Sequence, residues 1–393
     1  MAPPKQHLRG QSFHSIRRTV EGIYYLAPRR DCRRGLAYTF GLGVEESGVM
    51  PHVEITMSNH RQGVATCLTG KRSKFHEKHH GIFALQYNGH LGRNGYMWDH
   101  RGPTEPVLLP DYEEDEDEKK FFFAHGENEE QKERWQSRWD ALGLSTMERT
   151  ILYDLMNPIS AGLVQHFDGF PGFKIGPADW GRWNVKVKPG WINKLYPELS
   201  AFMALPPPSW WDQVELVDCG DSRIVVVPDL LRAFEERRQW AKLERPCGPQ
   251  RLDAAAYELF ISSENLERAR AHYLDLMAIL EDQFREERAA SGKRVIGAHE
   301  LREQDPFEKP SGPDILQGKS RCKPRFTGSP KAVKRAQEAY RVWNRRYWIA
   351  LGRFNARRDF NVVFPAGTVR MAEIASVRCR GRPLADENPN LPP

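Results

Sequence analysis

Two pairs of side chains have the types and the spacing needed to hold a metal ion beside a nucleophile. His60 and Gln62 are two residues apart in an expected strand, so both leave the same face. Tyr153 and Asn157 are four residues apart in an expected helix, so they also share a face. One imidazole and two amide oxygens could hold Mg²⁺ or Mn²⁺, and a phenolate beside that ion could attack a polarised phosphodiester. Two plainer interpretations stay open: Tyr153 as a core residue and His60 as a loop histidine.

The segment HEKHH, residues 76–80, matches the zinc motif H-E-x-x-H. On a helix, His76 and His80 would share a face around zinc, and Glu77 would act as general base. The two x positions of the motif, Lys78 and His79, are polar, unlike those of a buried metal-binding helix, and no third ligand follows at the spacing of the extended motif. We therefore favour a solvated or phosphate-facing helix here, with a metallopeptidase as a distant alternative.

Basic residues are concentrated near the C-terminus. The 393-residue chain has a formal net charge of +6, but residues 319–382 hold 17 Lys and Arg against 3 Asp and Glu, a local charge of +14. The rest of the chain therefore carries −8. A localised basic segment of this kind suggests a nucleic-acid partner.

An expected helix from about residue 330 interleaves Tyr340, Trp343 and Tyr347 with cations. It can be an amphipathic helix with an aromatic core face and a solvated basic face, or a surface that tracks phosphates, and the two interpretations are compatible. The cations that would bind DNA there are Lys331, Lys334, Arg335, Arg341, Arg345 and Arg346.

Several elements can be predicted from patterning. Residues 8–28 indicate two strands around a turn at Glu21-Gly22, and HVEITMSN and RQGVATCL indicate a further strand pair. A helix is expected from Ser73 to about His90. Another begins at Ser145 with an S-x-x-E capping box and should end at Pro158. Two more helices, at 266–284 and 330–351, precede a broken strand in VVFPAGTVRM. The apolar stripe of the first of them predicts core packing at Leu266, Ala269, Tyr273, Met277, Leu280 and Phe284.

The length allows two or three domains. We expect a first domain over 8–176, with an acidic insertion at about 111–136 that contains DYEEDEDE. Such a run is typical of a solvated insertion, and a mimic of DNA phosphates is the functional alternative. A connecting region over 177–260 has a proline-rich edge at 206–208. A mostly helical basic extension over 261–382 and a tail over 383–393 complete the chain.

Composition excludes several classes of protein. Hydrophobic residues make up 40% and charged residues 28%, which excludes a wholly disordered chain. The six cysteines form no CxxC pair and favour reduced thiols. The N-terminus lacks the apolar core of a secretory signal, and no stretch approaches the ~20 apolar residues of a membrane-spanning helix. A cytoplasmic protein without a membrane partner is therefore expected.

The order of these motifs resembles the REP-associated tyrosine transposases, which belong to the HUH single-strand DNA transposases. The resemblance covers roughly residues 8–176: the strand FHSIRRT, the segment MSNH, the pattern Y-x-x-x-N-P-x-x-x-G-L-V, and HFDGFPGF. By position, Tyr153 matches the family's nucleophile, and His60 and Asn157 match metal ligands. Gln62 stands where the family has a second histidine, so the sequence reads H-x-Q, and Gln62 would be a weaker oxygen ligand. The C-terminal part is similar to the extension of longer members.

The resemblance implies an α+β fold with a ferredoxin-like antiparallel sheet, helices on one face, and a mostly helical C-terminal extension. Tyr153 would attack single-stranded DNA with Mg²⁺ or Mn²⁺, giving a 5′-phosphotyrosine and a free 3′-OH. Arg17 and Arg18 are further candidates for DNA contacts, and His14 is either a DNA contact or structural. The main alternative is an inactive, domesticated relative that binds single-stranded or hairpin DNA without cutting it. A homodimer is possible in either case.

Overall fold

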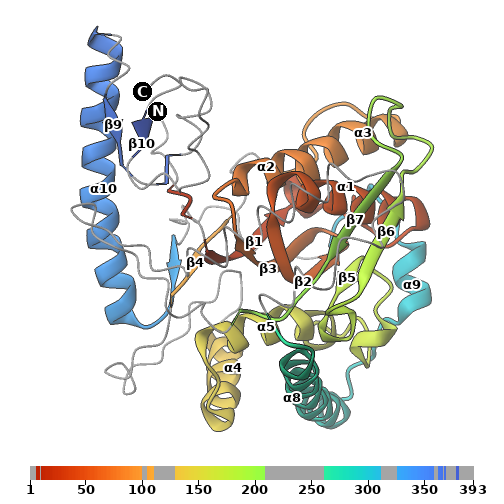
Figure 1. The fold of residues 1–393 in the computed structure, drawn as a ribbon. Helices are drawn as coiled ribbons and strands as arrows, with labels where there is room; N and C mark the ends of the chain where they lie inside the picture. Colours follow the sequence, from red (N-terminus) through yellow and green to blue (C-terminus); the bar gives the residue numbers. More distant parts are fainter. Residues whose placement is uncertain are drawn as a thin grey trace.

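The computed structural model describes residues 6–8, 10–99, 104–109, 129–208, 261–310, 325–357, 362–365, 367–368 and 378–379. Its centre is a six-stranded sheet with the strand order β5-β2-β3-β1-β4-β8 (Figure 1). Neighbouring strands are antiparallel, except β4 and β8, which are parallel. This confirms the expected α+β fold with a mostly antiparallel sheet. The strands are β1 (Gln11–Arg18), β2 (Val49–Met57), β3 (His60–Cys67), β4 (Val107–Leu108), β5 (Lys174–Ile175) and β8 (Phe326–Thr327).

The central strands β1, β2 and β3 confirm three of the four predicted strands. β2 and β3 form a hairpin in which Met57 pairs with His60, and β1 lies on the other side of β3. The fourth predicted strand, over residues 23–28, is wrong. After a 3₁₀ turn (η1, Val20–Gly22), Ile23 and Tyr25 make hydrogen bonds to nearby carbonyls, so this stretch is a series of tight turns.

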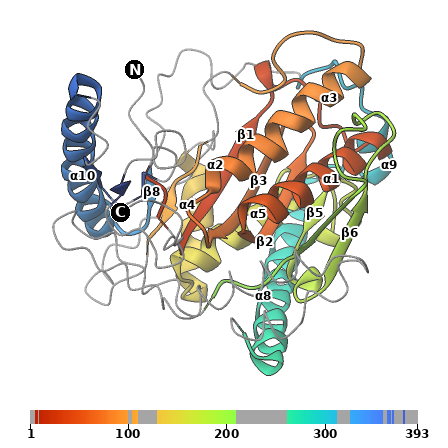
Figure 2. The ribbon, with the colours of Figure 1, turned by 45° about the horizontal axis from the view of Figure 1, so that its top comes forward.

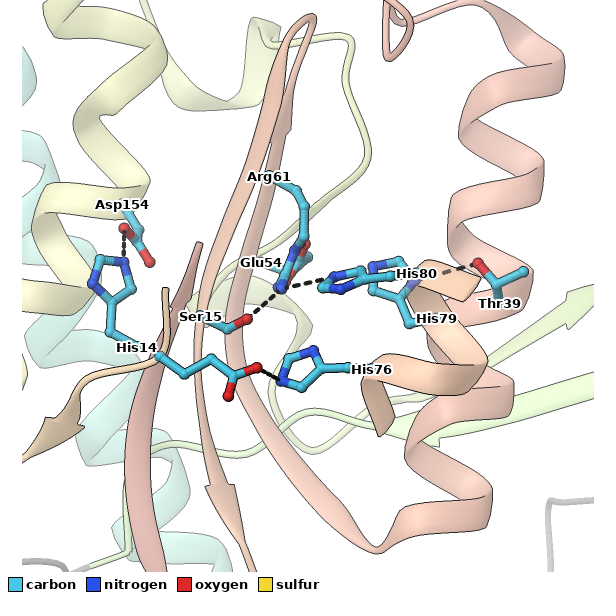
Figure 3. A network of polar contacts seen from close by, with 10 residues as sticks. His14, Ser15, Thr39, Glu54, Arg61, His76, His79, His80 and Asp154 are labelled. Atoms are coloured by element: carbon cyan, nitrogen blue, oxygen red, sulfur yellow. Dashed lines mark hydrogen bonds and ion pairs between the residues drawn. The ribbon is translucent and has the colours of Figure 1, made fainter. Parts of the chain in front are cut away.

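Helices cover both faces of the sheet, as Figures 1 and 3 show. The layer formed by α5 and α8 corresponds to the expected layer on one face, and the structure adds a second layer opposite. The second layer is required because both faces of β1, β2 and β3 carry buried side chains. The first layer contains α4 (Glu129–Leu142), α5 (Thr146–Ser160) and α8 (Ser263–Ser291), and the second contains α1 (Arg30–Ser47), α2 (Arg72–His76), the π-helix η2 (Glu77–Ile82) and α3 (Phe83–His90).

Helix α1 lies in a stretch for which patterning makes no prediction. It contains Gly35, Gly41 and Gly43, and glycine weakens helix propensity by about 1 kcal/mol per residue. The structure explains Gly41: a Cβ there would lie 2.7 Å from the Ser200 hydroxyl of a neighbouring hairpin. Gly41 therefore lowers the helix propensity of this stretch but permits α1 to pack closely against the hairpin that contains Ser200.

Helix α5 begins as predicted and ends two residues later. The Ser145 hydroxyl accepts a hydrogen bond from the Glu148 backbone, and the Glu148 carboxylate accepts one from the Ser145 backbone at 2.8 Å. The expected end at Pro158 is wrong, because the helix continues to Ser160. Pro158 has no N–H to donate to the carbonyl of Asp154, so one helical hydrogen bond is lost. The end of the helix is still closed by Ala161 and Leu163, which donate to the carbonyls of Asn157 and Pro158.

The segment after α5 returns to the sheet and then packs on α1. It contains the 3₁₀ turns η4 (Phe167–Gly169) and η5 (Pro177–Asp179) and the hairpin of β6 (Trp183–Val187) and β7 (Leu199–Met203). β6 and β7 contact α1, and the Ser200 hydroxyl donates to the Tyr38 carbonyl at 2.9 Å. The described part of the expected connecting region, up to residue 208, is thus attached to the sheet domain, and residues 209–260 lie outside the described residues.

The C-terminal helices α8 and α10 lie in different parts of the molecule. α8 confirms the predicted amphipathic helix and buries Tyr273, Met277, Leu280 and Phe284. α10 (Pro330–Arg357) confirms the predicted final helix, and Figures 1 and 2 both place it beyond β8, on the opposite side of the sheet from the short helix α9 (Ala298–Glu303). Two short parallel strands, β9 (Val363–Phe364) and β10 (Arg378–Cys379), accompany α10.

No helix within the described ranges is long and apolar enough to cross a membrane. Of the cysteines, Cys32 and Cys67 are buried free thiols. Most of the expected acidic insertion, residues 111–128, lies outside the described residues. Its last part belongs to α4, where Trp135 is buried, so residues 129–136 are not a solvated loop.

Candidate nucleic-acid interface and the region around Tyr153

His60 and Gln62 share the face of β3 that α5 covers. The side chain of Arg61, between them, contacts residues on the opposite face. His60 is half-buried, its Nδ1 lies 2.8 Å from Asn59 Oδ1, and its strand partner is Arg18. Burial, assisted by the Arg18 charge, lowers the pKa of His60 to about 3. The imidazole is therefore neutral at physiological pH, which is the form that binds metals.

Gln62 is fully buried, and neither atom of its amide has a hydrogen-bond partner within the described part of the chain. An unsatisfied buried amide costs about 1–3 kcal/mol. Sites that bind ligands can retain such a group because the ligand completes its hydrogen bonds. Gln62 is therefore the best structural indication of a site on this face.

The Tyr153 side chain lies in an aromatic cluster and is only 4% exposed. Its ring centroid is 5.5 Å from that of Trp135 and 6.5 Å from that of Trp139, both in α4. Trp135 also contacts Phe284 of α8 at 5.1 Å. The ring is thus covered by two tryptophans of α4, and Trp135 is itself packed against α8, so a DNA strand could reach the buried side chain only after α4 moved.

A buried pair fixes the rotation of α5. His14 Nε2 of β1 lies 2.8 Å from Asp154 Oδ1, and both side chains are buried (Figure 3). Burial raises the pKa of Asp154, and the His14 ring counteracts this. Because adjacent helix residues are about 100° apart, holding Asp154 against the sheet turns Tyr153 toward α4. His14 is therefore structural. Sequence reasoning missed Asp154, although an acid inside the apolar run ILYDLM could have pointed to it.

The expected metal site offers only neutral donors. Asn157 is half-buried near the end of α5, and its backbone carbonyl accepts hydrogen bonds from Ala161 and Ser160. His60, Gln62 and Asn157 together offer one imidazole and two neutral amides, whereas Mg²⁺ and Mn²⁺ sites generally include carboxylates. The donor set alone therefore favours weak binding. No group of three His, Cys, Asp or Glu suited to a metal occurs among the described residues.

The opposite face of the sheet holds a buried polar network (Figure 3). Arg61 pairs with Glu54, its Nη1 donates to Ser15 Oγ at 2.7 Å, and the same atom lies 3.3 Å from His80 Nε2. His79 Nδ1 lies 3.2 Å from the Thr39 hydroxyl of α1. Burial raises the pKa of Glu54 to about 7 against the lowering effect of Arg61. This network joins the sheet to α1 and η2.

The histidines of the H-E-x-x-H match lie in this buried region, but Glu77 does not, so the match does not form a zinc site. His79 and His80 are buried, and His76 Nε2 lies 2.6 Å from Glu105 Oε1. The expectation of a solvated or phosphate-facing helix is therefore wrong for the histidines. Glu77 lies at the surface, 2.8 Å from Lys74, so it cannot act as general base beside the imidazoles. The motif's segment is a π-helix packed on the sheet.

Arg17 and Arg18 are both half-buried. Arg17 lies over the Trp98 ring at 6.0 Å, and burial lowers its pKa to about 10 even though Asp99 and Glu105 are close. Arg18 lies beside His60 through strand pairing. Arg17 therefore contributes to the packing at the end of β1, and both arginines remain only predicted DNA contacts.

The cations of α10 form the most exposed part of the expected site. Residues 330–357 contain eight Lys and Arg and one Glu, a net charge of +7. All six predicted DNA-binding cations of this helix are exposed, and Lys334, Arg341, Arg345 and Arg346 form no ion pair with any described residue. The opposite side of the helix is packed: Trp343 is fully buried and stacks between Tyr340 and Tyr347. The aromatic residues of this stripe thus form the core face.

Comparisons with protein-family models, with curated proteins and with solved structures found no match. The resemblance to tyrosine transposases therefore rests on the sequence motifs alone.

Proposed function

We propose that this protein binds single-stranded or hairpin DNA through the exposed cations of α10, as a relative of the tyrosine transposases that does not cut DNA through Tyr153. The observation that carries the proposal is the basic face of α10, where four exposed cations lack an acidic partner among the described residues. Unpaired cations at helical spacing attract a polyanion, because each phosphate contact releases bound counterions. A helix held rigidly by its aromatic face presents those cations at little entropic cost.

Two features support binding without cutting. Trp135 and Trp139 pack against the Tyr153 ring, so the phenol is not available to a phosphodiester in this conformation. Gln62 replaces the second histidine of the family motif, and the remaining donors carry no negative charge to offset a divalent cation. Both features weaken the arrangement that transesterification requires.

A second candidate function is transesterification at Tyr153, because α5 covers the same face of β3 from which His60 and Gln62 project. The Tyr153 phenol would give its proton to water or a nearby base, and its oxygen would attack the phosphorus. The bond from phosphorus to the 3′-oxygen would break, and that oxygen would take up a proton to give a 3′-OH. Mg²⁺ or Mn²⁺ held by His60, Gln62 and Asn157 would supply charge stabilisation at the phosphate. This candidate requires the aromatic cover over Tyr153 to open.

The experiment incubates the full chain with a hairpin-bearing single-stranded oligonucleotide and Mg²⁺ or Mn²⁺. Binding is measured by fluorescence anisotropy, and a covalent adduct by denaturing electrophoresis. We expect binding without an adduct, both in the natural protein and in Gln62→His. An adduct that disappears in Tyr153→Phe would establish the second candidate instead, and absence of binding would refute both.

The proposal also includes a location in the cell and an oligomeric state. We propose a cytoplasmic location, consistent with the free thiols of Cys32 and Cys67, and a homodimer remains a prediction. Light scattering of the protein with and without the oligonucleotide would determine the oligomeric state.

A further inference from the structure

One tryptophan of α10 differs from the packed aromatic residues of that helix. Trp348 is 36% exposed, whereas Trp343, five residues earlier, is fully buried. Trp348 therefore lies outside the core face. A large exposed aromatic side chain beside cations has the composition of a single-strand nucleic-acid platform, in which bases stack on rings and phosphates bind to nearby charges.

Trp348 belongs to a continuous stripe along the helix, which we call the basic stripe. The basic stripe consists of Lys334, Arg341, Arg345, Trp348 and Gly352, with spacings of 7, 4, 3 and 4 residues. At 100° per residue these five positions fall within about 60° of one another around the helix. Lys334, Arg341 and Arg345 are exposed. The stripe therefore offers three cations and one aromatic side chain to a single partner.

The Trp348 ring packs against a neighbouring aromatic side chain. It meets the Tyr347 ring edge to face, with centroids 5.5 Å apart and an interplanar angle of 84°. Tyr347 in turn stacks on Trp343 at 5.7 Å and contacts Phe364 of β9 at 5.7 Å. This chain of contacts restricts the ring, so little conformational entropy would be lost when a base stacks on it.

Gly352 leaves one side of Trp348 uncovered. Helical side chains lean toward the N-terminus, so a side chain at 352 would extend over Trp348, one turn earlier. A Cβ built at Gly352 meets no atom within 4 Å, so packing does not require glycine here. Glycine is also an unfavourable residue in an exposed helix interior. Gly352 is explained if the space beside the Trp348 ring has to stay open for a ligand.

We propose that Trp348 stacks on one base of a single-stranded nucleic acid while Arg341 and Arg345 bind the flanking phosphates. This inference rests on the proposed function and adds a preference for unpaired over duplex strands, because the bases of a duplex are already stacked on one another. Gly352 keeps the stacking position accessible.

The experiment compares three probes of equal length: single-stranded oligo-dT, an abasic oligonucleotide with the same phosphates, and a duplex, whose second strand adds further phosphates. Trp348→Ala in the full chain is expected to weaken oligo-dT binding by roughly 5- to 150-fold, the range for loss of one base–aromatic stack. Binding to the abasic strand should stay unchanged, and Trp348→Phe should retain most of the affinity. Gly352→Leu should also weaken oligo-dT binding selectively, whereas Gly352→Ala should not.

The outcomes separate the inference from the function on which it rests. If Trp348→Ala weakens binding to oligo-dT and to the abasic strand equally, or leaves both unchanged, the stacking role is overturned. If Arg341→Gln with Arg345→Gln also changes neither affinity, the proposed function fails as well. Retention of the natural helical content by circular dichroism is required of each variant, and the selective loss in Gly352→Leu tests stacking without touching the ring.

Discussion

At the scale of single residues, Asp154 determines where its neighbour Tyr153 points. The carboxyl group contacts His14 across the interface of α5 and β1, and both groups are buried. The Tyr153 ring packs against Trp135 and Trp139 of α4. A single buried polar pair thus fixes the rotation of α5 and with it the direction of Tyr153.

Asp154→Ala should lower the free energy of unfolding by about 1–3 kcal/mol, because it leaves the buried His14 ring without its partner. Urea denaturation followed by circular dichroism measures the change. Asp282→Ala is the control, since Asp282 is an exposed acid paired with Arg285 on α8 and should change stability by less than about 0.5 kcal/mol. Equal effects of the two substitutions would show that the buried pair is unimportant.

The buried residue His52 should make the stability of the protein depend on pH. His52 is fully buried between Thr66 Oγ1 and the Leu205 carbonyl, and burial lowers its pKa to about 4. Below about pH 6.5 the unfolded chain takes up a proton that the folded chain does not, so stability is lost as the pH falls from about 6.5 to about 4. Between pH 7 and pH 5 this should remove about 2 kcal/mol.

The measurement is urea denaturation of the natural protein and of His52→Gln at several pH values. The variant is expected to be less stable at pH 7 but to lose less stability on acidification. If the two proteins lose stability in parallel between pH 7 and pH 5, His52 takes up its proton equally in both states and the prediction is wrong.

At the scale of elements, the glycines of two helices have opposite roles. Gly352 of α10 faces open space, whereas a Cβ at Gly41 of α1 would collide with the Ser200 hydroxyl, which is held by the Tyr38 carbonyl. The first glycine weakens its helix without any packing reason, and the second is needed for the contact between α1 and β7. A glycine in a helix can therefore mark either a close packing contact, as at Gly41, or an unfilled space, as at Gly352.

Gly352→Ala should raise the free energy of unfolding by about 0.5–1 kcal/mol, from the gain in helix propensity. Gly41→Ala should instead lower it by about 1 kcal/mol, because the cost of overpacking exceeds the same gain. Thermal unfolding of both variants beside the natural protein tests the pair. A stabilising Gly41→Ala would mean that α1 and β7 are less closely packed than described.

The same elements show what patterning can and cannot predict. Alternation predicted β2 and β3, a capping box predicted the start of α5, and apolar spacing predicted α8 and α10, because in each case local sequence agrees with the final packing. Helix α1 was missed because its glycines serve tertiary contacts. Other features depend on partners that are distant in sequence, which spacing cannot reveal. His79 is buried against Thr39 of α1, and the direction of Tyr153 depends on the contact between Asp154 and His14.

At the scale of the whole molecule, the sheet and the basic helix are distinct parts joined by the parallel pairing of β4 and β8. The C-terminal segment also packs on the first part of the chain: Arg288 of α8 donates to the Ile159 carbonyl of α5, and the Ser58 hydroxyl, after β2, donates to Gln304. The extension is therefore integrated with the region that resembles a transposase. The charge follows this division, since +14 lies in residues 319–382 and the rest of the chain is net acidic.

Binding of DNA by the exposed cations of α10 is tested most directly by measuring how the affinity for a single-stranded oligonucleotide depends on salt. Each phosphate contact contributes about 0.7 to the slope of log K against log salt for single strands. Arg341→Gln with Arg345→Gln should therefore reduce the slope by about 1.4. The matched control is Arg268→Gln with Arg285→Gln, two exposed arginines of α8 already paired with Glu264 and Asp282, which should leave the slope unchanged. Equal slopes for the natural protein and the α10 variant would contradict the claim.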